Sequence, residues 1–241
     1  MKEGRSVARG LLQYGAALAL VHLTAACSSE TPQPDATPVA APSAGVASNE
    51  AEIAEQKRVV VFGDSLFAGY NLPQDKGFAP ALERALAASG IHARVFNAGV
   101  SGDTSAAGLQ RLAFTLDGQQ QKPDLVVVGL GANDMLRGLS PEDTRKNLDA
   151  ILAELKRRDI PAMLTGMVAA PNMGADYAAA FNSIYPDLAR VYDVPLYPFF
   201  LDGVITDRTL LLPDGIHPNE QGVEAITARV SPIVAEALQD K

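Results

Sequence analysis

The sequence predicts an α/β fold, a three-layer α/β/α sandwich around a mostly parallel central sheet. Two observations support this class. From Lys57 onward, short apolar runs alternate with amphipathic segments of helical period. The apolar runs have the length of strands and are nearly free of polar residues, as is typical of parallel strands buried on both faces; they cover residues 59–62, 93–96, 125–130 and 162–167.

Amphipathic patterns between these runs predict the helices. The clearest covers residues 141–158, with Ser140 as its N-cap and Pro141 in the first turn. Leucines three and four residues apart predict an earlier helix around residues 109–116. Two further helices contain prolines that are expected to disturb them. Pro186 is expected to kink the one with apolar residues at 177, 181, 184 and 188, and Pro232 to bend or split the last one, which starts near Val223.

Residues 1–26 have the pattern of an export signal, in which basic residues precede an apolar stretch too short to be a persuasive membrane span. The stretch that ends in Ala25-Ala26-Cys27 resembles the lipobox of bacterial lipoproteins, where a lipid is attached to the cysteine after cleavage. Lipidation of Cys27 would anchor the protein, and Ser28 favours the outer membrane, facing the periplasm. The alternative is an ordinary signal peptide cut near Ala26 and a soluble periplasmic protein.

Residues 28–56 are predicted to be a disordered linker rich in Pro, Ala and Ser. Such a segment cannot bury enough apolar surface to offset the entropy lost on ordering. Residues 57–241 then form one folded domain, which the linker would hold away from a membrane.

The composition argues against several classes of function. The chain has 20 Lys and Arg against 28 Asp and Glu, a net charge of −8. Removal of residues 1–26 takes away three basic side chains and one acidic side chain, so the charge becomes −10. This balance and the lack of a basic cluster argue against nucleic-acid binding. Cys27 is the only cysteine, and the acidic and histidine residues form no ligand cluster, so no internal disulfide, metal or other cofactor is expected.

Short polar motifs follow the first three predicted strands. They contain Ser65 in Gly63-Asp64-Ser65, Gly102 in a glycine-rich segment, and Asn133 in Gly131-Ala132-Asn133-Asp134. Ligands of parallel sheets bind at the carboxyl ends of the strands, so these residues are placed for chemistry. Gly102 is expected at the start of a helix, where free N–H groups can donate to an anion. Each motif taken alone could instead be a turn or a helix cap.

Asp214 and His217 stand three residues apart before the last predicted helix. In a turn, this spacing lets the carboxylate accept a hydrogen bond from the near imidazole N–H. That bond fixes the tautomer and leaves the far nitrogen free to take a proton. The alternative is a turn that begins at Asp214, with a solvated histidine. Of the other histidines, His22 lies in the export signal and His92 is expected at the polar edge of a strand.

In their order along the chain, these motifs resemble the sequence blocks of the SGNH (GDSL) hydrolase superfamily, named for its Ser, Gly, Asn and His. The resemblance covers about residues 57–235 and is strongest toward the bacterial periplasmic thioesterase/protease/lysophospholipase and arylesterase group. It implies a flavodoxin-like sandwich. It extends to the stretches 101–105, 136–138, 180–186, 194–196, 198–200 and 215–219.

The resemblance also implies a role for each residue. Ser65 is the nucleophile, His217 the general base and Asp214 the residue that orients His217. The oxyanion hole consists of the Ser65 N–H, the Gly102 N–H and the Asn133 side-chain amide.

The activity implied is that of an esterase or thioesterase that hydrolyses short- to medium-chain acyl esters through an acyl-enzyme. Its partners are small acyl esters or thioesters, and a monomer is expected. Apolar residues after the third and fourth strands are expected to flank Ser65 and bind the acyl chain, among them Met135, Leu136, Ala170 and Pro171, unless they serve only loop packing. Two alternatives are a carbohydrate O-acetylesterase or acyltransferase of the same superfamily, and a lipoprotein that binds acyl groups without cleaving them.

Overall fold

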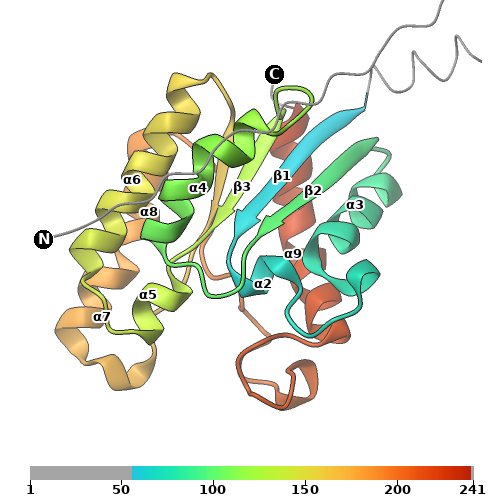
Figure 1. Ribbon diagram of the computed structural model, residues 1–241. Coiled ribbons are helices and arrows are strands. Elements are labelled where there is room, and N and C mark those ends of the chain that lie inside the picture. Colours follow the sequence, from blue (N-terminus) through green and yellow to red (C-terminus); the bar gives the residue numbers. More distant parts are fainter. Residues whose placement is uncertain (1–55, 240–241) are drawn as a thin grey trace, which may run out of the picture. The chain divides into compact units, whose positions relative to one another are not determined.

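The computed structural model describes residues 56–239, which form the predicted three-layer α/β/α sandwich (Figure 1). The five strands of the sheet have the order β2-β1-β3-β4-β5, and every neighbouring pair is parallel. The predicted export signal, Cys27 and the predicted linker as far as residue 55 lie outside the described residues. The strands are Lys57–Gly63 (β1), Ala93–Gly99 (β2), Leu125–Gly129 (β3), Ala162–Thr165 (β4) and Leu196–Tyr197 (β5).

Four of these strands lie where the apolar runs predict them. β3 and β4 are buried at every residue because helices cover both of their faces, whereas β2, at the sheet edge, has exposed residues between buried ones. β5 is an addition to the prediction. A strand of two residues has no periodic pattern of its own, and its position is fixed by pairing with β4.

Helices cover both faces of the sheet (Figure 1). α3 packs against α9 on one face, and α4 and α8 pack against α6 on the other. The short helices α2 and α5 lie at the carboxyl end of the strands, where the predicted motifs are (Figure 1). The helices are Ser65–Ala68 (α2), Phe78–Ala88 (α3), Ser105–Asp117 (α4), Ala132–Leu136 (α5), Pro141–Arg157 (α6), Ala175–Asn182 (α7), Ile184–Tyr192 (α8) and Glu220–Gln239 (α9).

Pro186 corrects the sequence prediction. The apolar spacing predicts one helix kinked at Pro186, but the chain forms two helices, α7 and α8, separated at Ser183. In a continuous helix the Pro186 ring would clash with the carbonyl of Asn182; the break places Pro186 in the first turn of α8, where its missing N–H costs nothing. Pro232 lies inside α9, which continues to Gln239, so the helix is not split.

Candidate active site

The position of Ser65 follows from the way β1 ends. Gly63 is the last residue of β1, and Asp64 caps the next helix by accepting a hydrogen bond from the Leu66 N–H at 3.0 Å. Ser65 is the first residue of α2 and is half-buried. Its side chain therefore lies at the carboxyl end of the sheet, directly after β1, which lies between β2 and β3.

α2 can lie this close to the sheet because glycines end the neighbouring strands. A Cβ on Gly99, at the end of β2, would stand 2.3 Å from the Ala68 nitrogen, and one on Gly129, at the end of β3, would stand 2.2 Å from the Phe67 ring. Phe67 is itself fixed by Phe78 and Phe200, with ring centroids 5.2 and 4.9 Å away. The nucleophile candidate is thus mounted on a helix with little freedom to move.

His217 reaches Ser65 from the loop before α9, 152 residues along the chain. The Asp214 Oδ1 accepts the backbone N–H groups of Ile216 (2.9 Å) and His217 (3.0 Å), which closes the turn, and Gly215 takes a positive φ of 71° within it. The His217 Nδ1 lies 2.8 Å from the Asp214 Oδ2, and its Nε2 lies 2.8 Å from the Ser65 Oγ. The three side chains form a continuous chain of hydrogen bonds.

This chain of contacts has the geometry needed to activate a hydroxyl group. With Nδ1–H donated to Asp214, the His217 Nε2 is free to accept the Ser65 proton. Partial burial raises the pKa of Asp214, but the hydrogen bonds from the His217 and Ile216 N–H groups and from the His217 ring outweigh it, so the pKa of this carboxyl lies below its usual value. The Tyr70 ring packs on the imidazole, with centroids 4.4 Å apart. His92 lies at the other end of the sheet, just before β2, and its side chain is exposed.

Asn133 and Gly102 lie on segments that follow β3 and β2, at the same carboxyl end of the sheet as Ser65. The Asn133 Nδ2 donates to the Asp103 carbonyl at 3.0 Å and lies 3.5 Å from the Asp64 carboxylate. The Arg137 Nη2 donates to the Gly102 carbonyl at 2.7 Å. Among the described residues, the backbone N–H groups of Ser65 and Gly102 donate to no protein acceptor, so both remain available to a ligand.

Two details of these loops differ from the predictions. Gly102 does not open a helix: α4 begins at Ser105 with Thr104 as its cap, and Gly102 lies in the preceding turn with φ +87°. The alternative that the Asn133 motif is only a turn does not hold either, because Asn133 lies in a helix. Gly131 takes the positive φ, 114°, and Asn133 is the second residue of α5.

An apolar cavity of about 420 Å³ opens beside Ser65, His217 and Asn133. All four side chains predicted to bind substrate line it: Met135, Leu136, Ala170 and Pro171. The loop after β5 contributes lining residues beyond the predicted ones, Phe199, Leu201 and Ile205, and Ile216 comes from the turn that carries His217. The volume of this cavity, about 420 Å³, is in the usual range for a site that binds a small molecule.

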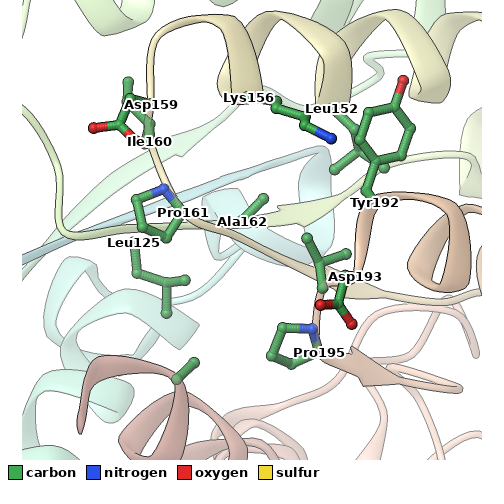
Figure 2. Close-up of a pocket in the computed structure, with 12 residues that line it drawn as sticks. Leu125, Leu152, Lys156, Asp159, Ile160, Pro161, Ala162, Tyr192, Asp193 and Pro195 are labelled. Carbon is green, nitrogen blue, oxygen red and sulfur yellow. The ribbon is translucent and has the colours of Figure 1, made fainter. Parts of the chain in front are cut away.

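A larger cavity, of about 760 Å³, lies at the opposite end of the sheet, where β3 and β4 begin (Figure 2). Its polar side chains are Lys156, Asp159, Tyr192 and Asp193, and its lining includes neither serine nor histidine. The chemistry available at Ser65 therefore has no counterpart there. In the part of the chain that the structure describes, no three His, Cys, Asp or Glu side chains are grouped as a metal ion would require.

Asp64, next to Ser65, is a buried carboxyl group. Burial raises its pKa to about 7, the Leu66 N–H bond opposes this, and the nearby Asp134 and Asp103 carboxylates add to it. In the unfolded chain the group would titrate near 3.8. Because the folded-state pKa is the higher one, the stability that protonated Asp64 contributes is complete below pH 4 and is lost as the pH rises through 7.

Asp64→Asn is expected to remove this pH dependence, since asparagine keeps the oxygen that caps α2 and carries no charge. The variant should exceed the wild type in free energy of unfolding at pH 8, by on the order of a few kcal/mol at about 1.4 kcal/mol per pKa unit. At pH 4 the two proteins should be nearly equal. Urea unfolding at both pH values measures the difference, with Glu236→Gln, an exposed carboxylate on α9, as the control for loss of one charge. If the difference in free energy of unfolding between Asp64→Asn and the wild type were the same at pH 4 and at pH 8, this would contradict the raised pKa of Asp64.

Comparison with known proteins agrees with this geometry. The model of the GDSL-like lipase/acylhydrolase family matches residues 61–225. The chain belongs to this family. An arylesterase of Vibrio mimicus is 40% identical over 165 residues, which are 68% of this chain and 82% of the arylesterase. The thioesterase 1/protease 1/lysophospholipase L1 of Escherichia coli is 39% identical over 161 residues, which are 67% of this chain and 75% of that enzyme.

The fold agrees as well. The crystal structure of AlinE4, an SGNH-hydrolase family esterase, is 52% identical and superposes with a TM-score of 0.66, covering 76% of this chain and 97% of AlinE4. Both the activity class and the fold expected from the motifs are thereby confirmed: this GDSL-family protein is an ester hydrolase with an α/β sandwich fold.

Proposed function

We propose that the protein is a serine esterase that uses Ser65, His217 and Asp214 to hydrolyse short- to medium-chain acyl esters and thioesters. The observation that carries the proposal is the hydrogen-bonded chain Asp214–His217–Ser65, with 2.8 Å at each step, beside an apolar cavity. The nucleophile, its base and the group that orients the base have the arrangement that activates a serine.

The reaction proceeds in two halves. The Ser65 Oγ bonds to the acyl carbon while its proton passes to the His217 Nε2, and the carbonyl oxygen becomes an oxyanion held by the Ser65 and Gly102 N–H groups and the Asn133 amide. Collapse of this intermediate expels the alcohol or thiol, which takes the proton from His217. Water then attacks the acyl-enzyme and gives a proton to His217. As this second intermediate collapses, the Ser65 oxygen takes that proton back from His217 and the carboxylic acid is released.

The apolar cavity supports the acyl specificity. We expect activity on p-nitrophenyl acetate, butyrate and octanoate and on the matching acyl thioesters, because the lining offers contacts to a hydrocarbon chain and few polar groups to a sugar. Steady-state kinetics on this series measures the preference. Activity confined to acetylated sugars would point to the O-acetylesterase alternative, and binding without turnover would point to a non-catalytic acyl-binding protein.

A substitution in the cavity sharpens this test. Ala170→Phe adds bulk to the lining, so the octanoate ester should lose about tenfold or more in kcat/KM while acetate loses little. Ala180→Phe makes the same change on the exposed surface of α7, outside the cavity, and serves as the control. Equal losses for both esters would show that the acyl chain does not occupy this cavity.

We propose further that the protein is exported and anchored by lipid at Cys27, with a soluble periplasmic form as the alternative. The position of Ser65 supports a tethered enzyme: the predicted linker would end where β1 begins, at Lys57, and Ser65 follows the other end of that strand. The site thus faces away from the point of attachment. Within residues 56–239, no helix has the length and apolar character of a membrane span.

Full-length protein is expected to partition into membranes, and Cys27→Ser is expected to release it, because bacterial lipoproteins carry several acyl chains, whereas a single chain binds only marginally. Fractionation followed by immunodetection measures both proteins. The esterase activity of Cys27→Ser should be unchanged, which separates anchoring from catalysis. A wild-type protein found in the soluble periplasmic fraction would contradict the lipid anchor.

A further inference from the structure

Arg111, on α4, joins two of the loops that form the proposed site. Its Nε donates to the Asp103 Oδ2 at 2.6 Å, and its Nη2 donates to the Gly63 carbonyl at 3.0 Å. Gly63 is the last residue of β1 and precedes Asp64 and Ser65, whereas Asp103 follows Gly102. One guanidinium group therefore donates both to the segment that precedes Ser65 and to the turn that contains Gly102.

The same connection extends to Asn133. Asp103 has two partners. Its carboxylate pairs with Arg111, and its backbone carbonyl accepts a hydrogen bond from the Asn133 side-chain amide at 3.0 Å. The Gly63 carbonyl, the second acceptor of Arg111, also accepts the Val100 N–H at 3.0 Å. Each of the three proposed oxyanion donors is thus within two residues, or one hydrogen bond, of a group that Arg111 contacts.

We propose that Arg111 is a positioning residue of the oxyanion hole. Its planar fork sets the spacing between the Ser65 end of β1 and the Gly102 turn, and through Asp103 it orients the Asn133 amide. This inference rests on the proposed function, because it takes those three groups as the donors. Arg111 itself acts through its neighbours and touches no substrate.

The surroundings of Arg111 make the contact strong and directional. The side chains of Arg111 and Asp103 are only 21% and 12% exposed, so water screens their attraction weakly. The guanidinium also lies over the Phe62 ring, 4.2 Å from its centroid. Lysine carries the same charge as a single point and cannot reproduce two divergent N–H bonds. Arg111→Lys therefore keeps the charge and loses the geometry.

Oxyanion stabilisation depends on donors held within a fraction of an ångström, so a loosened fork should affect the transition state more than substrate binding. Arg111→Lys is expected to lower kcat by about 10- to 100-fold and to change KM by less than about threefold. The inhibition constant of an acyl trifluoromethyl ketone, whose adduct with Ser65 carries an oxyanion, should rise by about the same factor as kcat/KM falls. All rates are normalised to active sites titrated with a fluorophosphonate.

Arg145 provides a matched control. It lies on α6 and donates to the Ser183 Oγ at 3.0 Å and the Asp187 Oδ2 at 2.8 Å. Within residues 56–239, these side-chain hydrogen bonds do not involve the loops of the site. Arg145→Lys should lower the melting temperature but leave kcat and the ketone inhibition constant unchanged. Asp103→Asn is a second variant at the site itself. It removes the ion pair but keeps an acceptor oxygen for Arg111, and it should lower kcat in the same direction as Arg111→Lys.

The outcomes separate this inference from the proposed function. Normal kcat per titrated site in both Arg111→Lys and Asp103→Asn would overturn the positioning role, as would a raised KM with unchanged kcat. If those variants have normal kcat while Asn133→Ala has a lowered kcat and Ser65→Ala is inactive, only the role of Arg111 is contradicted. If Ser65→Ala keeps its activity, the proposed function itself fails.

Discussion

Ser65→Ala is expected to abolish hydrolysis of every ester in the acyl series and to prevent labelling by a fluorophosphonate. The Ser65 Oγ lies 2.8 Å from the His217 Nε2, so it is the hydroxyl group that can give up its proton as it attacks. Removal of the nucleophile from such a triad typically lowers kcat by about 10⁵-fold or more. Burst kinetics with p-nitrophenyl butyrate and gel fluorescence after labelling measure the two effects.

Two controls make this result specific. Ser101→Ala removes an exposed serine on the neighbouring turn and should leave both activity and labelling intact. His217→Ala keeps the Ser65 hydroxyl but removes its base, so labelling should become very slow while the fold is retained. Labelling that persists in Ser65→Ala would show that another serine is the nucleophile. The proposed mechanism would then be wrong.

The central sheet could be predicted because β1, β3 and β4 are buried on both faces, which leaves continuous apolar runs in the sequence. Other elements depend on packing. α3 has buried residues four apart, Phe78, Leu82 and Leu86, a helical signal that is present in the sequence but absent from the predicted elements. β5 has no signal at all, since its two residues form a strand only through pairing with β4.

The local geometry of the site could also be predicted in part. A spacing of three residues sufficed to pair Asp214 with His217, because the contact lies within one turn. The contact between His217 and Ser65 spans 152 residues, so no local spacing predicts it and only the family resemblance pairs the two residues. Tyr70 and Arg111 were not singled out, since the position of the Tyr70 ring on His217 and the reach of Arg111 to Gly63 depend on how the loops pack.

Asn133→Ala is expected to lower kcat by about 10²- to 10³-fold, equivalent to about 2.7–4 kcal/mol, while KM changes little. The Asn133 Nδ2 has two hydrogens. One donates to the Asp103 carbonyl at 3.0 Å, which fixes the amide, and the other makes at most a weak contact with Asp64 at 3.5 Å. That second hydrogen is available to the carbonyl oxygen of a substrate, and its bond strengthens as the oxygen gains charge.

A purely structural role predicts a different result. Loss of the bond to Asp103 would then lower the melting temperature, but each folded molecule would turn over at a near-normal rate. Asn97→Ala is the matched control: Asn97, in β2 near the same sheet edge, donates to the Ala68 carbonyl at 3.3 Å and accepts the Gly99 N–H at 2.9 Å. Asn97→Ala should lower the melting temperature without the loss of kcat that is expected for Asn133→Ala.

Melting curves and active-site titration on the same preparations separate the two roles of Asn133. Near-normal turnover per titrated site in Asn133→Ala would remove the amide from the oxyanion hole. The variant should keep measurable activity, because the Ser65 and Gly102 N–H groups still donate to the oxyanion. Asn133→Ala should therefore be slower than the wild type by two to three orders of magnitude, and faster than Ser65→Ala by a comparable margin, about 10²-fold or more.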